Sequence, residues 1–125
     1  MLINLTTCPS VKWSDEQKWV ATSEWGAIMD YPFPIVDANA ASEDILATAH
    51  DIAENVVKLH PAAVLVQGEM ALTYVLVNLL QKARISVYTA SFARDKITSQ
   101  DESGNLVKSS VYRFAQFRRY PDVNV

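Results

Sequence analysis

A short polar turn interrupts the most apolar stretch of the chain, and its residues are of types that bind anions. The apolar run Ala62–Val66 ends at Gln67, Gly68 and Glu69, and a second apolar run begins at Met70. Glycine allows a close approach of the backbone, and the first turn of a helix offers free N–H groups to a negative charge. The Glu69 carboxylate would repel a phosphate, so it either caps the helix or orients a hydroxyl group or a water molecule beside the ligand.

Hydroxyl groups follow the first apolar segment of the chain. Thr6, Thr7 and Ser10 carry them, and together with backbone N–H groups they could hold a phosphate. A polar turn whose groups bond one another is an equally good interpretation. Lys12 adds a positive charge and Trp13 a stacking surface, although Trp13 could instead pack against the helix that follows.

Two further polar residues could contribute chemistry. Asp30 ends the second apolar segment, where it could orient a ribose hydroxyl or simply cap the proline turn that follows. Thr73 carries a hydroxyl group one turn into the helix after Gly68. Asp30 and Glu69 form only a weak metal-binding pair, and the single Cys8 excludes an internal disulfide and a cysteine-based zinc site. We therefore expect no metal and no cofactor.

The C-terminal part of the chain combines basic and aromatic residues. Arginine beside aromatic rings suits nucleotide binding, through phosphate contacts and base stacking, and it suits a protein interface equally well. The residues are Arg94, Lys96, Arg113, Arg118 and Arg119, with Tyr112, Phe114, Phe117 and Tyr120.

Apolar runs and helical periodicity predict the elements that hold these residues. A strand, a glycine turn and a buried helix at residues 62–82 form the central unit of an α/β sheet. Ligands of such sheets bind at the carboxyl ends of the strands. The alternation predicts a parallel sheet with right-handed crossovers and helices on both faces. We expect strands at Leu2–Thr6, Ala27–Asp30, Ala62–Val66 and Ile85–Ala90, and helices at Ser14–Trp25, Ser42–Leu59 (with Ser42 as its cap) and Met70–Leu80.

The tail departs from this alternation. Ser91–Ser99 is polar and mixed in composition, and Gln100–Asn105 has the composition of a turn. Val107–Tyr120 alternates as a hairpin does, with Val111–Arg118 as an antiparallel edge strand. The predicted fold is a three-layer, Rossmann-like α/β domain, with a mostly parallel sheet of about four strands and a C-terminal antiparallel hairpin or edge strand.

Length and charge limit the class of protein. The 125 residues suit one domain, residues 1–125, and half of them are hydrophobic, as in ordinary globular proteins. A net charge of −3 gives no general attraction to duplex nucleic acid or to a membrane surface. The apolar helix at Met70–Leu80 is shorter than a bilayer needs, and without a signal peptide the cytoplasm is the expected compartment.

Three short motifs together resemble a known family. They are Thr6-Thr7-Cys8-Pro9 after the first strand, Asp30-Tyr31-Pro32, and Gln67-Gly68-Glu69 before the apolar helix. Residues 1–90 resemble the small CRISPR-associated Rossmann-like (CARF-related) ring nucleases of type III CRISPR systems, although members of that family carry histidine where this chain has Cys8.

The resemblance implies a homodimer that binds a cyclic oligoadenylate, with cyclic tetra-adenylate favoured, across its two-fold axis. It implies cleavage without a metal, by attack of a ribose 2′-OH that leaves a 2′,3′-cyclic phosphate. A sensor or sponge that binds without cleaving, and a structural interaction subunit, remain alternatives. The implied catalytic residues are Glu69, Lys12 and Asp30, and the implied ligand-binding residues are Thr6, Thr7, Ser10, Trp13, Gln67, Gly68, Met70, Thr73 and Arg94.

Overall fold

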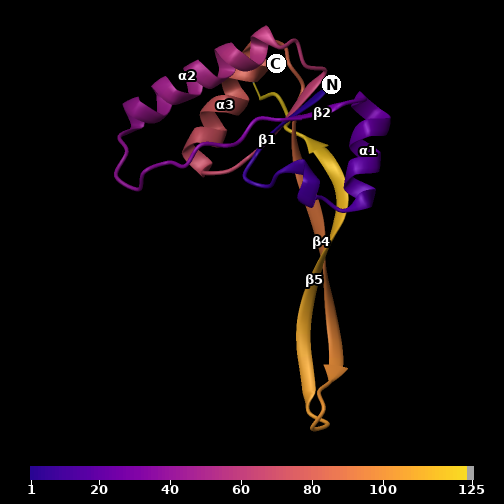
Figure 1. Cartoon of the computed structure of the whole chain (residues 1–125). Coiled ribbons are helices and arrows are strands. Elements are labelled where there is room, and N and C mark those ends of the chain that lie inside the picture. Colours follow the sequence, from indigo (N-terminus) through magenta and orange to yellow (C-terminus); the bar gives the residue numbers. More distant parts are fainter. Residues whose placement is uncertain (124–125) are drawn as a thin grey trace.

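Five strands form one sheet in the order β2-β1-β3-β4-β5 (Figure 1). The computed structural model describes residues 1–123. Strands β1 to β4 are parallel, and β5 pairs antiparallel with β4. In chain order the elements are β1 (Leu2–Thr6), the 3-10 turn η1 (Ser10–Lys12), α1 (Asp15–Trp25), β2 (Ile28–Asp30), α2 (Ser42–Lys58), β3 (Ala63–Gln67), α3 (Met70–Lys82), β4 (Val87–Gln100) and β5 (Leu106–Arg119).

Helices cover both faces of the parallel part of the sheet, as the sequence predicts. Helices α2 and α3 pack on one face, where Ile3 and Val64 enter the larger core. Helix α1 lies on the other face, where Leu2 and Leu65 enter a smaller core with Ala21. Strand β1 is buried along its whole length because successive side chains enter opposite cores.

The helix boundaries agree with the capping signals, with one exception. The Ser14 hydroxyl accepts a hydrogen bond from Gln17 N at 3.2 Å, and Gly26 ends α1 with a φ of 84°. The prediction that Ser42 caps α2 is wrong, because Ser42 is already helical and Ala41 is the N-cap. Ala41 has no side-chain acceptor, and the Asp44 carboxylate accepts from its backbone N–H at 3.4 Å.

The C-terminal region is more regular than the sequence indicates. Residues Ser91–Ser99, to which the sequence analysis assigned no element, belong to β4, which runs for 14 residues to Gln100. Strand β5 has 14 residues as well and begins at Leu106. The sheet therefore has five strands, and the hairpin is longer than expected. Polar residues occupy both sides of the outer part of β4, so this segment lacks the apolar alternation that marks a half-buried strand.

The outer hairpin projects from the domain as a twisted two-stranded arm, residues 93–113 (Figure 1). A β-bulge between Ser91 and Phe92 marks the point where the hairpin leaves the body. Just inside it, Phe117 packs against Trp25 at a ring-centroid distance of 5.3 Å and against Phe114 at 4.9 Å. These aromatic contacts fasten the base of the arm to α1.

No helix within residues 1–123 combines the length and the apolar composition needed to cross a membrane.

Gly68 owes its identity to close packing within the protein. A Cβ atom at this position would overlap the ring of Phe33, a core residue that is 8% exposed. The Phe33 backbone N–H in turn donates to Thr6 O at 3.3 Å, which holds this segment against the end of β1. The glycine therefore lets the residues after β2 pack across the end of β3.

We expect Gly68→Ala to lower the free energy of unfolding by about 1–3 kcal/mol, because the added methyl group overpacks the core against Phe33. Chemical denaturation of the purified variant measures this loss. In a Phe33→Leu background the same substitution should cost much less, since the ring is gone. An equal cost in both backgrounds would show that the backbone, and not the ring, requires glycine.

Candidate functional site

The carboxyl ends of β1 and β3 form the point where the chain connections reverse direction. After β1 the chain passes to α1 on one face, and after β3 it passes to α3 on the opposite face. The two strands are neighbours, and Thr6 pairs with Gln67 at their ends. Ligands of open parallel sheets bind in the crevice at such a switch point.

Two cavities flank this crevice, one on each face of the sheet. The cavity on the α3 face has a volume of about 460 Å³, and the cavity on the α1 face about 350 Å³. Gln67 lines both of them. The residues selected from the sequence are therefore divided between these two cavities, or chambers, which share Gln67 at the end of β3.

The α1-side cavity contains most of the residues predicted from the first loop. Thr6, Thr7, Lys12 and Trp13 line it. Trp13 is only 6% exposed and packs against Phe117 at 5.9 Å, so its ring is part of the core as well as of the cavity wall. The hairpin closes the other side of this cavity with three aromatic residues, Phe92, Tyr112 and Phe114.

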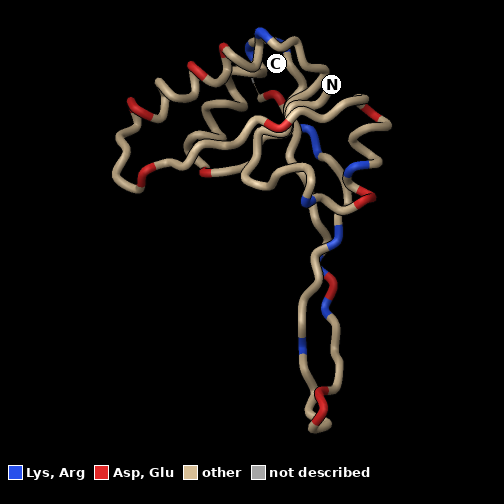
Figure 2. The backbone as a smooth tube through the Cα atoms, viewed as in Figure 1, with Lys and Arg blue, Asp and Glu red and all other residues tan. Residues whose placement is uncertain are grey.

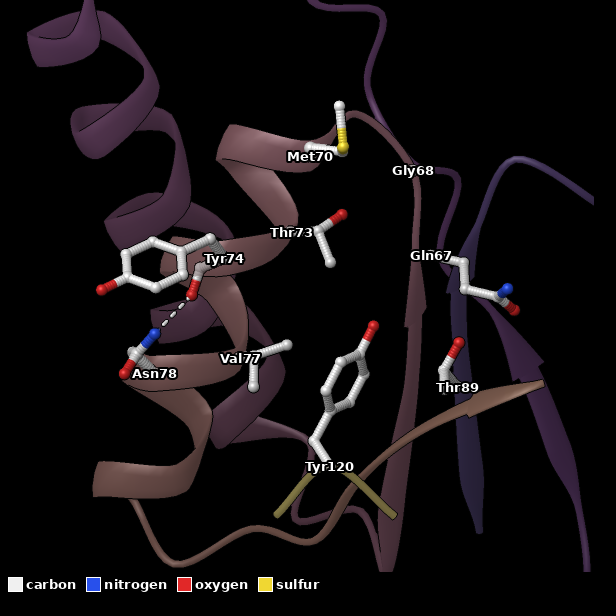
Figure 3. Close-up of a pocket in the computed structure, with 9 residues that line it drawn as sticks. All are labelled: Gln67, Gly68, Met70, Thr73, Tyr74, Val77, Asn78, Thr89 and Tyr120. Carbon is white, nitrogen blue, oxygen red and sulfur yellow. Dashed lines mark hydrogen bonds between the residues drawn. The ribbon is translucent and has the colours of Figure 1, made fainter. Parts of the chain in front are cut away.

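The α3-side cavity contains four predicted residues, Gly68, Met70, Thr73 and the shared Gln67. The Thr73 Oγ1 atom is buried and has no hydrogen-bond partner among the described residues. A buried hydroxyl without a partner costs free energy, so an atom in this position is suited to a polar group of a ligand. Figure 3 shows Thr73, Thr89 and Tyr120 around the space between α3 and the sheet.

Sequence reasoning did not assign four polar residues to this cavity. Periodicity places α3 residues on a face but does not show that Tyr120, after the last strand, returns to that face. Its hydroxyl donates to Val66 O at 3.4 Å, across 54 positions of sequence. The missed residues are Tyr74, Asn78, Thr89 and Tyr120.

Gln67 has a positioning role that its sequence context does not reveal. Its side-chain Oε1 accepts from Ala90 N at 3.1 Å, and its Nε2 donates to Ala90 O at 3.3 Å. Direct pairing between β3 and β4 is recorded only at two positions, Val64 with Val87 and Leu65 with Tyr88. The amide of Gln67 thus takes over from the backbone ladder where β4 begins to diverge toward the arm.

The buried side chain of Asn4, which was not a candidate on sequence grounds, bonds to three other residues at this edge. It lies within β1 and is 1% exposed. Its Nδ2 donates to Cys8 O and to Asp30 Oδ1, each at 2.9 Å, and its Oδ1 accepts from the Thr6 hydroxyl at 2.8 Å. A buried polar side chain in a strand was the available signal, because such a group must find partners.

Asp30 fastens the loop after β1. Beyond its bond to Asn4, its carboxylate accepts from Ser10 N at 3.1 Å and from the Ser10 hydroxyl at 3.1 Å. Partial burial raises the pKa of this carboxyl, but the hydrogen bonds from Asn4 and Ser10 outweigh it and leave the pKa below 3.8. Asp30 is therefore ionised and fully engaged at neutral pH.

Glu69 caps α3, as one of the two interpretations predicts. Its two carboxylate oxygens accept from Ala71 N at 2.8 Å and from Leu72 N at 2.9 Å. The anion site offered by this helix terminus is thus occupied by the chain's own carboxylate. A second role toward a ligand stays a prediction.

Four of the predicted residues line neither cavity. Asp30 and Ser10 hold the loop behind the α1-side cavity. Glu69 caps α3 between two residues that line the α3-side cavity but does not line it itself. Arg94 lies on the arm, where its Nε donates to the Ser110 hydroxyl at 3.0 Å. Within residues 1–123, no three His, Cys, Asp or Glu side chains gather as a metal-binding group would require.

The chain is thus an α/β domain with a cavity on each face of its sheet at the switch point. The chain belongs to the uncharacterized protein MJ1673 family, whose model matches residues 2–118. No curated protein and no solved structure matches the chain.

Asp30→Asn should lower the free energy of unfolding at pH 7 by about 1 kcal/mol, because it weakens charge-assisted hydrogen bonds at a partly exposed site. The pKa is lower in the folded state, so the ionised carboxyl stabilises the fold above its unfolded pKa. That contribution disappears as the pH falls through the folded value, which lies below 3.8. Denaturation of wild type and variant from pH 7 to acid should therefore show the difference shrinking. Asp51→Asn, on the exposed part of α2, serves as the control, and a difference independent of pH would refute the argument.

Glu69→Ala should destabilise the protein by about 1 kcal/mol through loss of the cap, whereas Glu69→Ser, which keeps a capping oxygen, should cost less than half as much. Thermal and chemical denaturation of the two variants provide the comparison. Equal losses for serine and alanine would mean that the carboxylate stabilises the fold in another way.

Proposed function

We propose that the protein is a ring nuclease that binds a cyclic oligoadenylate in the crevice between β1 and β3 and cleaves it without a metal. The observation that carries the proposal is the switch point itself, with polar strand ends and a cavity on each face. A cyclic nucleotide presents phosphates, riboses and bases around one ring, and a crevice with two chambers of different lining offers separate places for such groups.

The α1-side chamber suits phosphate and base. Lys12 is exposed and, within residues 1–123, forms no ion pair, so its ammonium group is available to a phosphate. Phe92 and Tyr112 supply aromatic faces on the hairpin side, and the Thr7 hydroxyl is exposed at the end of β1. Base stacking on aromatic rings and a nearby cation are the usual means of binding unpaired nucleotides.

The α3-side chamber suits the polar edges of a ribose or a base. The unpartnered Thr73 hydroxyl offers both a donor and an acceptor, and Asn78 and Tyr120 line the same cavity. At the rim, Met70 is 85% exposed and Tyr74 71% exposed. Large exposed apolar groups beside a cavity suit coverage by a second copy, so a homodimer would enclose a two-fold symmetric ligand between two equivalent crevices.

The proposed reaction needs few catalytic side chains. A ribose 2′-oxygen attacks the adjacent phosphorus, the P–O5′ bond breaks, and the proton of the 2′-OH is lost while the 5′-oxygen gains one. Holding the 2′-oxygen in line with the leaving oxygen contributes at least about 7 kcal/mol in well-oriented intramolecular reactions. Lys12 would stabilise the charge that develops on the phosphorane oxygens. Asp30 and Glu69, whose carboxylates are hydrogen-bonded within the chain, would act by holding the two loops in place.

Binding without cleavage is a second candidate function. The observation that favours it is the engagement of both candidate carboxylates, because neither is left free to accept a proton from the attacking hydroxyl. A sensor or sponge needs only the crevice and the two chambers.

Incubation of the purified protein with cyclic tri-, tetra- and hexa-adenylate in EDTA tests the proposal directly. Chromatography should show a linear product that ends in a 2′,3′-cyclic phosphate, with the tetra-adenylate cleaved fastest. Lys12→Ala should slow cleavage by about tenfold or more while binding, measured as a ligand-induced rise in melting temperature, survives. Lys58→Ala makes the same charge change at the C-terminal end of α2 and should leave the rate unchanged.

Four results would change the assignment. Intact ligand with a raised melting temperature would leave a binder, and intact ligand without a melting shift would refute nucleotide binding at this crevice. Equal rates for Lys12→Ala and wild type would remove Lys12 from the chemistry. Glu69→Ser that cleaves normally would show that Glu69 acts only as a cap.

A further inference from the structure

The hairpin is the basic part of an otherwise acidic chain. Residues 91–119 contain six of the 11 Lys and Arg but only three of the 14 Asp and Glu. Figure 2 shows acidic residues spread over the body and at the tip of the arm, with basic residues along the arm between them. This separation of charge matters because a net charge of −3 conceals a local attraction for anions.

Strand register gathers the cations on one face of the arm. Arg94 lies opposite Tyr112, and Lys108 lies opposite Thr98, so these residues share a face with Lys96, two positions after Arg94. Asp95, the carboxylate residue within the two strands of the arm, lies on the other face. We call the first face the basic face, and it consists of Phe92, Arg94, Lys96, Lys108, Tyr112 and Phe114.

The opposite face neutralises its own charge. Asp95 Oδ2 accepts from Arg113 Nε at 3.2 Å, and both residues lie on the face of the arm opposite the basic face. From Phe92 to Gln100 on β4, and at the β5 positions that pair with them, the basic face therefore carries three cations and no carboxylate. The Asp101 carboxylate in the turn accepts from Ser103 N and Asn105 N, so it caps the turn.

Aromatic rings accompany these cations and connect the arm with the body. Tyr112 is 66% exposed and Phe92 is 46% exposed, although both carry large aromatic rings. Both also line the α1-side cavity, together with Lys12. The basic face thus continues from that cavity outward along the arm for roughly 25 Å, the length of eight extended residues.

We propose that the basic face of the arm binds a single-stranded nucleic acid. Its phosphates would contact Arg94, Lys96 and Lys108, and its unpaired bases would stack on Tyr112 and Phe92. A row of cations interspersed with exposed aromatic rings matches a strand that presents both phosphates and base faces. An acidic segment of a second copy would match the cations but would leave the exposed rings unexplained. The proposal goes beyond the ring-nuclease function, because this ligand is a linear polymer that follows the arm outward from the α1-side cavity, with which the basic face shares Phe92 and Tyr112.

The test is fluorescence anisotropy with a labelled single-stranded oligouridylate of about 12 nucleotides, titrated with the full-length protein from about 50 to 200 mM salt. The variant Lys96→Ala/Lys108→Ala removes two charges from the basic face. The matched variant Lys58→Ala/Lys82→Ala removes two lysines from α2 and α3. The arm variant should bind about tenfold more weakly or worse, with a salt slope reduced by about 1.4, whereas the matched variant should bind like wild type.

Stacking is tested separately from charge. Tyr112→Ala should weaken binding by about fivefold or more, and Tyr112→Phe, which keeps the ring, should restore it. Duplex RNA of the same length should compete poorly, because pairing hides the base faces. Since all these side chains are exposed, none of the variants should change the melting temperature appreciably.

Three outcomes would overturn the proposal. The first is an absence of binding by the wild-type protein at low salt. The second is an equal loss of binding in the arm variant and the matched variant, since only the general charge would then matter. The third is unchanged RNA binding by the arm variant with a change of molar mass in light scattering, which would assign the face to a second copy. Cleavage of cyclic oligoadenylate is measured in parallel on the two lysine variants, whose substituted residues line neither cavity of the crevice, so either function can fail alone.

Discussion

The side-chain amide of Asn4 holds the carboxyl edge of the sheet together. Its two N–H donors connect the loop after β1, at Cys8, with the end of β2, at Asp30. Asp30 then fixes Ser10, the first residue of the turn that carries Lys12. Because Asn4 is almost fully buried, losing any of these partners would leave a polar group unpaired in the core. The position of the cation in the α1-side cavity therefore depends on a residue inside the sheet.

Most of the polar side chains that could do chemistry at this edge are bonded within the chain and are not free to contact a ligand. Asp30, Glu69 and Gln67 use their side chains to hold loops, a helix end and a diverging strand. The groups left available are the Lys12 ammonium, the Thr73 hydroxyl and aromatic faces such as Tyr112. Such a site can position a ligand and stabilise charge but offers little acid–base chemistry, which is why the proposed reaction relies on orientation of the substrate's own hydroxyl group.

The arm shows how a strand can form without the pattern that predicts one. A two-stranded hairpin is only marginally stable by itself, and this one is held at its base by the Gln67 amide and by aromatic contacts among Trp25, Phe114 and Phe117. Farther out, both faces meet solvent, so neither needs to be apolar. Of the exposed rings and cations of the arm, the side chains of Tyr112, Lys96 and Lys108 have no hydrogen bond, ion pair or ring contact within residues 1–123, so they are free for binding.

The parallel α/β core can be predicted from the sequence, because buried strands and capped helices are visible in local composition. The sequence also placed the turn at Gln67–Met70 and the hydroxyl-rich loop at Thr6–Ser10 at the carboxyl edge of the sheet, because both follow strands. The folded structure was needed to show which candidates are already bonded within the chain, as with Glu69, and which distant residues join them, as with Tyr120 and Tyr112. The same holds for the regular pairing of Ser91–Ser99. These outcomes depend on contacts between residues far apart in the chain, and local patterns carry no record of such contacts.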